Sequence, residues 1–126
     1  MNENAKKWVE ALRSGRYPQA RNALKTKSGY CCLGVACELA VEAGIIESSV
    51  PVMDDGDCYF RYDGNESTLP EDVFEWIGMK GFMVGSDESP QGILVNYNDN
   101  EKWDFKQIAD WIEDHAEDVF DEQERS

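Results

Sequence analysis

The sequence predicts an α+β fold in a single compact domain, with a small, mostly antiparallel sheet packed against about four helices. Two observations indicate this class. Segments with the 3.6-residue period of amphipathic helices alternate with short apolar runs of strand length. The chain has 126 residues, which suits one domain with its own core. We expect residues 1–120 to form this domain and residues 121–126 to be a frayed acidic C-terminal tail.

The centre of the predicted core is the segment Tyr30–Cys37, which holds three of the four cysteines. A run of bulky apolar residues over Tyr30–Leu33 predicts a buried strand. This strand is expected to break at Gly34 and to continue as a helix over Val35–Ala43, where apolar residues recur at three- and four-residue spacing. Such a strand-to-helix corner belongs at the centre of a small α+β core.

Two helices are predicted before this corner. Asn4 is placed to cap a helix over residues 5–14, and Gly15 is placed to end it. Pro18 prevents a continuous helix, so the apolar residues that follow it predict a short second helix over residues 20–25.

Two strands joined by a turn are predicted after the corner. The apolar segment Ile45–Met53 contains Pro51, so we expect it to be a connector or an edge strand. The segment Asp54–Asp57 predicts a turn, and the alternating residues of Cys58–Tyr62 predict a strand. The aspartates are not spaced as a calcium loop, because the twelfth position would be Asn65 instead of a bidentate Glu.

The second half of the chain begins with another helix. Thr68 and Glu71 have the spacing of a capping box for a helix that ends at Gly78. A short strand is predicted over Phe82–Val84, inside a glycine-rich loop. The apolar run Ile93–Tyr97 is predicted to be the central strand of the sheet.

The last predicted helix has the clearest signals. Asp104 and Gln107 have the spacing of a capping box, and the charged residues alternate with an apolar stripe. The four tryptophans of the chain occur at helical spacing with other apolar residues, which favours core packing. The predicted stripe consists of Ile108, Trp111, Ile112, Ala116, Val119 and Phe120.

Charge is distributed unevenly along the chain. The formal net charge is −14, with +5 over residues 1–30 and −19 over residues 31–126. This balance excludes direct binding of nucleic acid over a broad surface, because phosphates would be repelled. The basic N-terminal region is either a solvated face or a site for a phosphate or carboxylate. The residues of that possible anion site are Arg13, Arg16, Tyr17, Arg21 and Lys25.

Cysteine and histidine residues raise the question of a thiol enzyme or a zinc site. We expect Cys31, Cys32 and Cys37 to be reduced, buried and metal-free, because they lie in apolar sequence. Zinc would need a cluster such as Cys-x-x-Cys, which distant Cys58 and His115 do not complete. The sequence therefore predicts no catalytic residue, metal or cofactor, and a thiol or zinc enzyme is the less favoured alternative.

Several motifs occur in a fixed order along the chain. They are Trp8-x-x-Ala11-Leu12-Arg13-Ser14-Gly15-x-Tyr17-x-Gln19, Tyr30-Cys31-Cys32-Leu33-Gly34-Val35-Ala36-Cys37, Leu69-Pro70, Asn98-Asp99 and Phe105-x-x-Ile108-Ala109-Asp110-x-Ile112-Glu113. Their order resembles that of a family of small, largely uncharacterised bacteriophage and prophage proteins. The resemblance implies a phage origin and a compact α+β fold, and it implies no catalytic residue. The chain departs from the family pattern at Ala20 and Asn22, where glycines are expected.

These observations lead to two hypotheses about function. The first is a non-catalytic phage accessory protein in the host bacterial cytoplasm that binds and modulates a host protein, without direct contact to nucleic acid or membrane. Its acidic surface would either imitate a line of phosphates, as expected of an anti-defence protein, or serve only to keep the protein in solution. The alternative is a small-ligand binder that sequesters an anionic nucleotide signal at the basic N-terminal residues. The predicted partner-binding acidic face consists of Glu113, Asp114, Glu117, Asp118 and Asp121.

Overall fold

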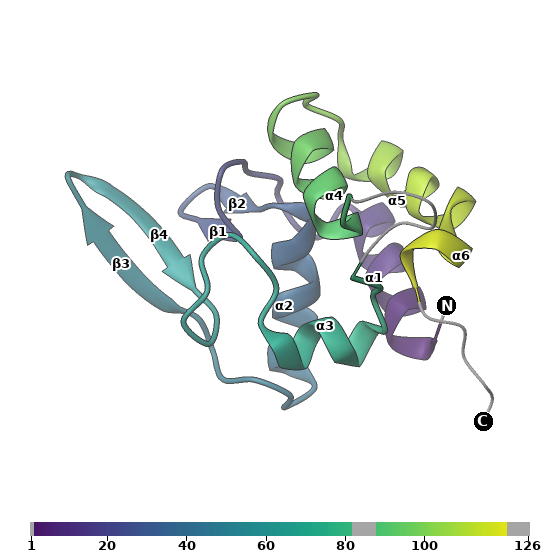
Figure 1. Cartoon of the computed structure of the whole chain (residues 1–126). Helices are drawn as coiled ribbons and strands as arrows, with labels where there is room; N and C mark the ends of the chain where they lie inside the picture. Colours follow the sequence, from purple (N-terminus) through teal and green to yellow (C-terminus); the bar gives the residue numbers. More distant parts are fainter. Residues whose placement is uncertain (1, 82–87, 121–126) are drawn as a thin grey trace.

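Six helices and four strands occur in the computed structural model, which describes residues 2–81 and 88–120 (Figure 1). The helices are α1 (Glu3–Ser14), α2 (Cys32–Glu42), α3 (Glu71–Ile77), α4 (Pro90–Asp99), α5 (Phe105–Asp114) and α6 (Ala116–Val119). The strands are β1 (Lys25–Thr26), β2 (Gly29–Tyr30), β3 (Val50–Asp54) and β4 (Asp57–Arg61). The predicted α+β fold in a single domain is confirmed.

Helix α2 is the element against which α1, α3 and α4 pack. Every residue of Cys32–Cys37 is buried, and α2 contacts α1, α3 and α4 as well as β2. Gly34 lies directly against the chain that enters β1, because a Cβ atom at this position would overlap the carbonyl oxygen of Leu24. The side chain of Trp8 joins α1 to the start of α2, because its Nε1 donates a hydrogen bond of 2.9 Å to the carbonyl oxygen of Cys32.

The four strands form one antiparallel sheet in the order β2-β1-β4-β3. Strand β3 is therefore an edge strand, as its proline predicted. The β3–β4 hairpin extends away from the helices at one end of the molecule (Figure 1). Asp55 and Gly56 at its tip have positive φ values of 49° and 85°, which is the conformation of a type I′ turn. The predicted turn is confirmed.

The prediction of a central strand over Ile93–Tyr97 is wrong, because these residues belong to α4. Helix α4 begins with a Ser89 side chain that accepts a hydrogen bond of 3.0 Å from the backbone N–H of Gly92, and Pro90 occupies the first turn. Both are helix start signals. A short apolar run cannot by itself be assigned to a strand or a helix, and here the cap decides.

The corner at the core also differs from the prediction. The strand expected over Tyr30–Leu33 ends at Tyr30, and the helix begins at Cys32, so the chain does not break at Gly34. Cys31 therefore lies at the N-cap of α2 and Cys32 in its first turn, not on a strand. The short helix expected over residues 20–25 is absent from the structure, where this segment is irregular and enters β1.

Two predicted helix caps and the length of the last predicted helix differ from the structure. The side chain of Asn2, not Asn4, accepts the capping bond of α1. Pro70 occupies the N-cap position of α3, so Thr68 does not cap that helix. The predicted final helix is divided at His115 into α5 and α6.

The capping box predicted for the last long helix is confirmed, and two other predictions fall on residues that the structure does not describe. The capping box of α5 is formed as expected by Asp104 and Gln107. The strand predicted over Phe82–Val84 and the tail predicted over residues 121–126 are outside the part of the chain that the structure describes. No described helix is long and apolar enough to cross a lipid bilayer.

Candidate partner-binding face

Four aromatic side chains form a row where α4, the loop after it and α5 meet. Tyr97 and Trp103 stack almost flat, with ring centroids 4.0 Å apart and an interplanar angle of 7°. Trp111 contacts Tyr97 edge to face at 5.4 Å, and its other side stacks on His115 at 4.3 Å. All four side chains are half-buried, and those of Tyr97, Trp103 and Trp111 pack against the core. We call Tyr97, Trp103, Trp111 and His115 the aromatic row.

The chain between α4 and α5 positions this row. Lys102 adopts a left-handed conformation with φ of 59°, which turns the chain back toward the end of α4. The backbone N–H of Trp103 then donates a 2.9 Å hydrogen bond to the carbonyl oxygen of Tyr97. Helix α5 starts immediately afterwards at the capping box, so Trp111 and His115 lie one helical turn apart beside the stacked pair. Nδ1 of His115 lies 2.9 Å from the carbonyl oxygen of Trp111, which fixes the imidazole ring.

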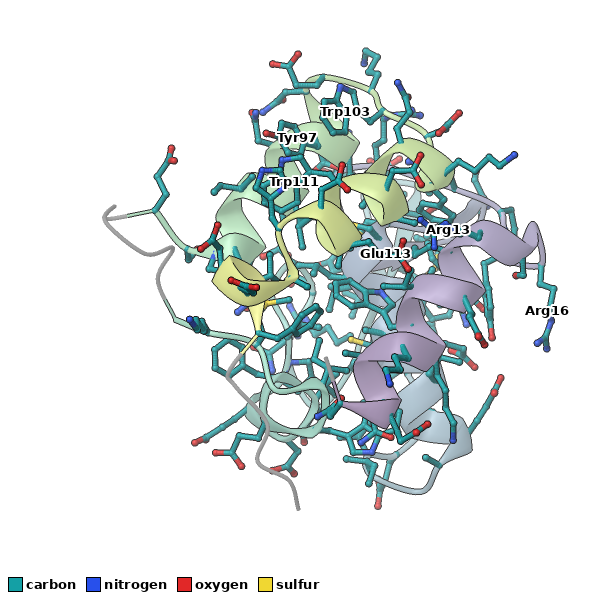
Figure 2. The ribbon with its side chains drawn as sticks, turned by 90° about the vertical axis from the view of Figure 1, so that its right-hand side faces the viewer. Arg13, Arg16, Tyr97, Trp103, Trp111 and Glu113 are labelled. Carbon is teal, nitrogen blue, oxygen red and sulfur yellow. The ribbon has the colours of Figure 1, made fainter. Side chains whose placement is uncertain are left out.

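Carboxylates lie beside the aromatic row on α5 and α6. Figure 2 shows Trp111, Tyr97 and Trp103 on the same side of the molecule as Glu113. The carboxylates share the spacing of one or two helical turns, and all but half-buried Asp118 are exposed. We call Asp110, Glu113, Asp114, Glu117 and Asp118 the acidic stripe.

The predicted acidic face is only partly unpaired. Glu113 accepts a 2.9 Å hydrogen bond from Arg13, and the same guanidinium binds Asp110 at 2.7 Å. The hydrogen bond from Arg13 lowers the pKa of Glu113. The carboxylates of Asp114, Glu117 and Asp118 have no side-chain partner among residues 2–81 and 88–120. Asp121, the fifth residue of the predicted face, lies outside the described residues.

The predicted anion site is not assembled as one group of free cations. Arg13 is bound to the two carboxylates of α5. Nε of Arg21 donates a 2.9 Å hydrogen bond to the carbonyl oxygen of Asn98 at the end of α4. Two of the three arginines expected at this site are therefore used to join elements of the fold.

The other predicted anion-site residues lie near the sheet. Lys25 places Nζ 5.4 Å from the ring centroid of Tyr30 and 4.6 Å from that of Phe60. The guanidinium of Arg16 is 5.6 Å from the ring centroid of Tyr17. The Tyr17 hydroxyl is buried and has no hydrogen-bond partner among the described residues, and desolvation raises its pKa. This arrangement provides cation–π contacts within the protein, with Arg16 as the exposed cation of the set.

Three of the four cysteines lie in buried surroundings that favour the protonated thiol. Cys31, Cys32 and Cys37 are free and buried, and desolvation raises the pKa of each. The value for Cys31 rises to about 12, although its sulfur lies at the N-terminus of α2. Cys58 is half-buried. Within the described part of the chain, no three His, Cys, Asp or Glu side chains are grouped so that they could hold a metal ion.

The sequence did not indicate the aromatic row. Trp103 and Trp111 were assigned to the core on the basis of their spacing, and Tyr97 was assigned to a strand. A signal was present in Ser89-Pro90, which starts α4 and thereby places Tyr97 near its end. The stack itself depends on how the loop between α4 and α5 turns, which residue spacing does not encode.

Comparisons with known proteins give one result. Neither the curated proteins nor the solved structures contain a match to this chain. Residues 1–116 match a protein family described as a domain of unknown function, DUF8296, and the chain therefore belongs to that family.

Proposed function

We propose that the protein is a non-catalytic accessory protein of phage origin that binds and modulates a host protein with a basic surface. The observation that supports this function is the aromatic row lying beside the acidic stripe on one side of the molecule. Partly exposed tryptophan and tyrosine rings are the side chains that most often dominate binding energy at protein interfaces. Exposed carboxylates next to them select a partner that presents arginine or lysine.

The two groups have complementary roles in this proposal. The stacked rings of Tyr97 and Trp103 offer an apolar surface and a π face for a guanidinium, a contact worth about 0.5–2 kcal/mol depending on its exposure. The unpaired carboxylates of Asp114 and Glu117 attract the cationic partner at long range. The net charge of −14 adds to this steering, which weakens as salt concentration rises.

The specific form of the proposal is mimicry of nucleic acid. Carboxylates spaced along α5 and α6 would occupy positions that phosphates take in the basic cleft of a host defence or nucleic-acid enzyme. The phage resemblance of the sequence motifs supports a host protein as the target, and the site of action would then be the bacterial cytoplasm. The buried thiols support a role without catalysis, because protonated thiols are poor nucleophiles.

The geometry favours this function over sequestration of an anionic nucleotide. Arg13 and Arg21, which would have supplied guanidinium groups for a phosphate, are already hydrogen-bonded to other elements. A thermal-shift screen with millimolar nucleotides separates the two functions. We expect no nucleotide to raise the melting temperature, whereas a nucleotide-binding site would stabilise the folded state.

The proposed function is tested by affinity capture from a bacterial lysate at low salt, with excess poly-glutamate to bind the basic proteins that attach to any acidic surface. The wild-type chain is compared with the triple variant Asp114→Asn, Glu117→Gln, Asp118→Asn, which leaves the Arg13 ion pairs intact. The matched control is Asp54→Asn, Asp55→Asn, Asp57→Asn, which removes three carboxylates from the tip of the hairpin.

We expect the wild-type chain and the control to retain a basic partner that the triple variant loses. Duplex DNA is expected to release that partner if the acidic stripe occupies a nucleic-acid site. Recovery of no partner at low salt, or equal recovery with the triple variant, would contradict the proposed function.

A further inference from the structure

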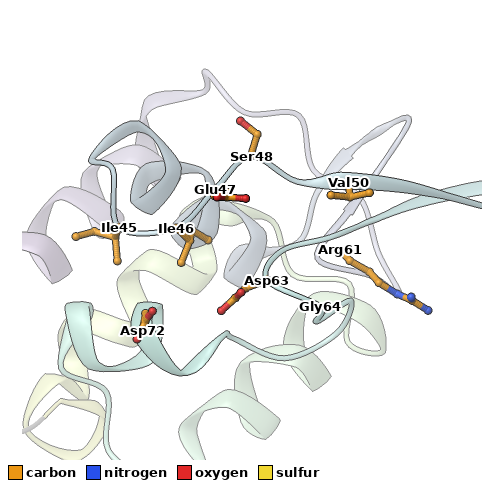
Figure 3. A pocket seen from close by; sticks show the side chains of 9 residues that line it. All are labelled: Ile45, Ile46, Glu47, Ser48, Val50, Arg61, Asp63, Gly64 and Asp72. Atoms are coloured by element: carbon orange, nitrogen blue, oxygen red, sulfur yellow. The ribbon is translucent and has the colours of Figure 1, made fainter.

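A cleft opens at the hairpin end of the molecule, away from the aromatic row. It lies between the segment after α2, the base of the β3–β4 hairpin and the first turn of α3 (Figure 3). Its volume is about 580 Å³, within the range of about 300–1,000 Å³ that is usual for binding clefts. The apolar part of its lining consists of Ile45, Ile46 and Val50.

Exposed hydrophobic side chains are concentrated around this cleft. Among the described residues, the large apolar side chains that remain exposed are Ile45 at 38%, Val50 at 62% and Met53 at 69%. All three lie within nine consecutive residues, and two of them line the cleft. A local concentration of exposed apolar surface marks a site of interaction more often than a scatter of single residues does.

The polar part of the lining is acidic. The carboxylates of Glu47, Asp63 and Asp72 line the cleft, and none of them has a side-chain partner in the described ranges. Figure 3 shows Asp63 and Asp72 pointing into the space between α3 and the segment after α2. The one cation of the lining, Arg61, points away in the same view, and its Nε donates a 3.1 Å hydrogen bond to Glu66. The cleft therefore combines uncovered apolar groups with negative charge that has not been neutralised.

We propose that this cleft is a second docking site, whose occupant is an extended segment of a partner protein in which lysine or arginine alternates with apolar side chains. The apolar side chains of that segment cover Ile45 and Val50. Its cationic side chains enter the cleft and pair with Asp63 and Asp72. Charge complementarity selects this occupant, because an acidic or neutral apolar segment would leave the three carboxylates unpaired against an apolar surface.

A second copy of the chain does not fit as the occupant. Each copy carries a net charge of −14, and the tip of the hairpin adds Asp54, Asp55 and Asp57 at the point of approach. Two such surfaces repel each other.

Pairing of a strand to the open edge of β3 is also disfavoured. Asp54 and Asp57 flank the two-residue turn and form a hydrogen-bonded pair, and such pairs alternate along antiparallel strands. The backbone groups of Pro51 and Met53 therefore face the open edge, where Pro51 has no N–H to donate. Recognition at this end is consequently through side chains in the cleft.

The test uses two capped synthetic hexapeptides and the full-length, isotope-labelled protein. The cationic probe has the sequence Leu-Lys-Val-Arg-Leu-Lys, and the acidic probe is Leu-Glu-Val-Glu-Leu-Glu. Binding is followed by two-dimensional amide NMR, which reports which backbone groups respond. We expect saturable shifts at the amides of Ile46, Val50 and Asp63 with the cationic probe, and none with the acidic probe.

Two variants locate the interaction. The double variant Asp63→Asn, Asp72→Asn should weaken the cationic probe about tenfold, because two partly exposed charge pairs are lost. Asparagine preserves the left-handed backbone of Asp63, whose φ is 52°. The triple variant of the acidic stripe should bind the probe as tightly as the wild type, so this result is independent of the proposed function. The inference is overturned by shifts spread over the acidic surface as a whole, by equal affinity for both probes, or by unchanged affinity of the double variant.

Discussion

Two regions of the molecule differ in how their charged side chains are used. Between α1, α4 and α5, charged and polar side chains bind one another, whereas the carboxylates of the cleft at the hairpin end face solvent. At the first region, Arg13 on α1 binds Asp110 and Glu113 on α5. At the second region, the carboxylates of the cleft lack side-chain partners in the described chain, and β3 carries two of the three exposed large hydrophobic residues. The contacts of the first region hold elements of the fold together, and the second region carries the docking site proposed above.

The sequence motifs follow the same division. Gln19 donates from Nε2 to Oδ1 of Asn98 at 2.8 Å, and Nδ2 of Asn98 donates to the carbonyl oxygen of Ala20 at 3.0 Å. The oxygen Oδ1 of Asp99 accepts from the backbone N–H of Asn22 at 2.9 Å. These partners are about eighty residues apart in the chain, yet Gln19, Asn98 and Asp99 all belong to the motifs that carry the phage resemblance. No such motif falls between residues 38 and 68, where the hairpin and most of the cleft lie. These motif residues therefore hold the scaffold together, and the proposed docking site at the hairpin end lies outside the motifs.

The largest expected effect of a substitution in the helical part of the molecule is at Gly34, on α2. A methyl group there would overlap the carbonyl oxygen of Leu24, which is backbone and cannot rotate away. We expect Gly34→Ala to lower the free energy of unfolding by about 3 kcal/mol or more, as measured by urea denaturation.

The matched control for this substitution is Gly81→Ala, at a position where a Cβ atom would meet nothing within 4 Å. This variant should lie within about 0.5 kcal/mol of the wild type. Equal stability of both variants would show that α2 does not lie against the Leu24 backbone.

The next largest effect is expected at Asn98, which is fully buried. Replacing it with alanine leaves the side-chain amide of Gln19 and the carbonyl oxygen of Ala20 with one hydrogen bond fewer. We expect Asn98→Ala to cost about 2–3 kcal/mol in the free energy of unfolding.

The hairpin end supplies the control, Asn65→Ala. The Asn65 amide makes an exposed 3.2 Å hydrogen bond to the carbonyl oxygen of Asp63, and its loss should cost no more than about 0.5 kcal/mol. A similar cost for both asparagine variants would remove the difference drawn between the two regions.

Secondary structure was predicted correctly for a helix with one solvent-exposed face. It was predicted poorly for a helix that is buried and for a helix whose start depends on its N-cap residue. Helix α5 has alternating charged and apolar residues and a capping box, and both signals were readable. Every residue of α2 from Cys32 to Cys37 is buried, so its first turn shows an unbroken apolar run instead of a helical period, and the sequence predicts a strand there. The run Ile93–Tyr97 is ambiguous for a related reason. Its length suits a strand or a helix, and only the cap at Ser89 distinguishes the two.

The candidate site was predictable only in its charge. The acidic residues of α5 and α6 were evident from composition, but their pairing was not, because Arg13 finds its partners about one hundred residues away. The contacts of the residues predicted to form an anion site were unpredictable for the same reason, since Arg21 donates a hydrogen bond to the carbonyl oxygen of Asn98, far away in the sequence. Contacts of this kind depend on tertiary packing, which local spacing does not determine.

The cysteines provide a direct comparison between the two regions. Cys32 is fully buried in α2, whereas Cys58 on β4 of the hairpin is half-buried. We expect Cys32→Ser to lower the free energy of unfolding by about 1–3 kcal/mol, because the buried hydroxyl loses hydration and, on a shorter bond, lies farther than the thiol from the carbonyl oxygen of Leu94, to which Sγ donates at 3.7 Å. Cys58→Ser should change it by no more than about 0.5 kcal/mol.

Alkylation with iodoacetamide at neutral pH gives a second measurement on the same residues. Cys58 should react first, because burial raises the pKa of Cys31, Cys32 and Cys37 and keeps those thiols protonated. Rapid labelling of one of the three buried cysteines in the native state, or zinc bound in stoichiometric amount, would contradict the structural assignment and favour a thiol or zinc enzyme.

The smallest expected effect concerns the exposed ion pair of Glu113 and Arg13. The hydrogen bond from Arg13 lowers the pKa of Glu113 in the folded state below its ordinary value of 4.5. A lowered folded-state pKa means that the pair stabilises the fold above that ordinary value, and that the stabilisation is lost as the pH falls through the lowered value. Glu113→Gln should therefore reduce the melting temperature slightly at pH 7 and have no effect once the carboxyl is protonated. Glu47→Gln, which removes an unpaired carboxylate at the hairpin end, should show no such loss between the two pH values. Thermal unfolding followed by circular dichroism checks both variants, and a Glu113→Gln difference that persists in acid would show that the carboxylate does not act through Arg13.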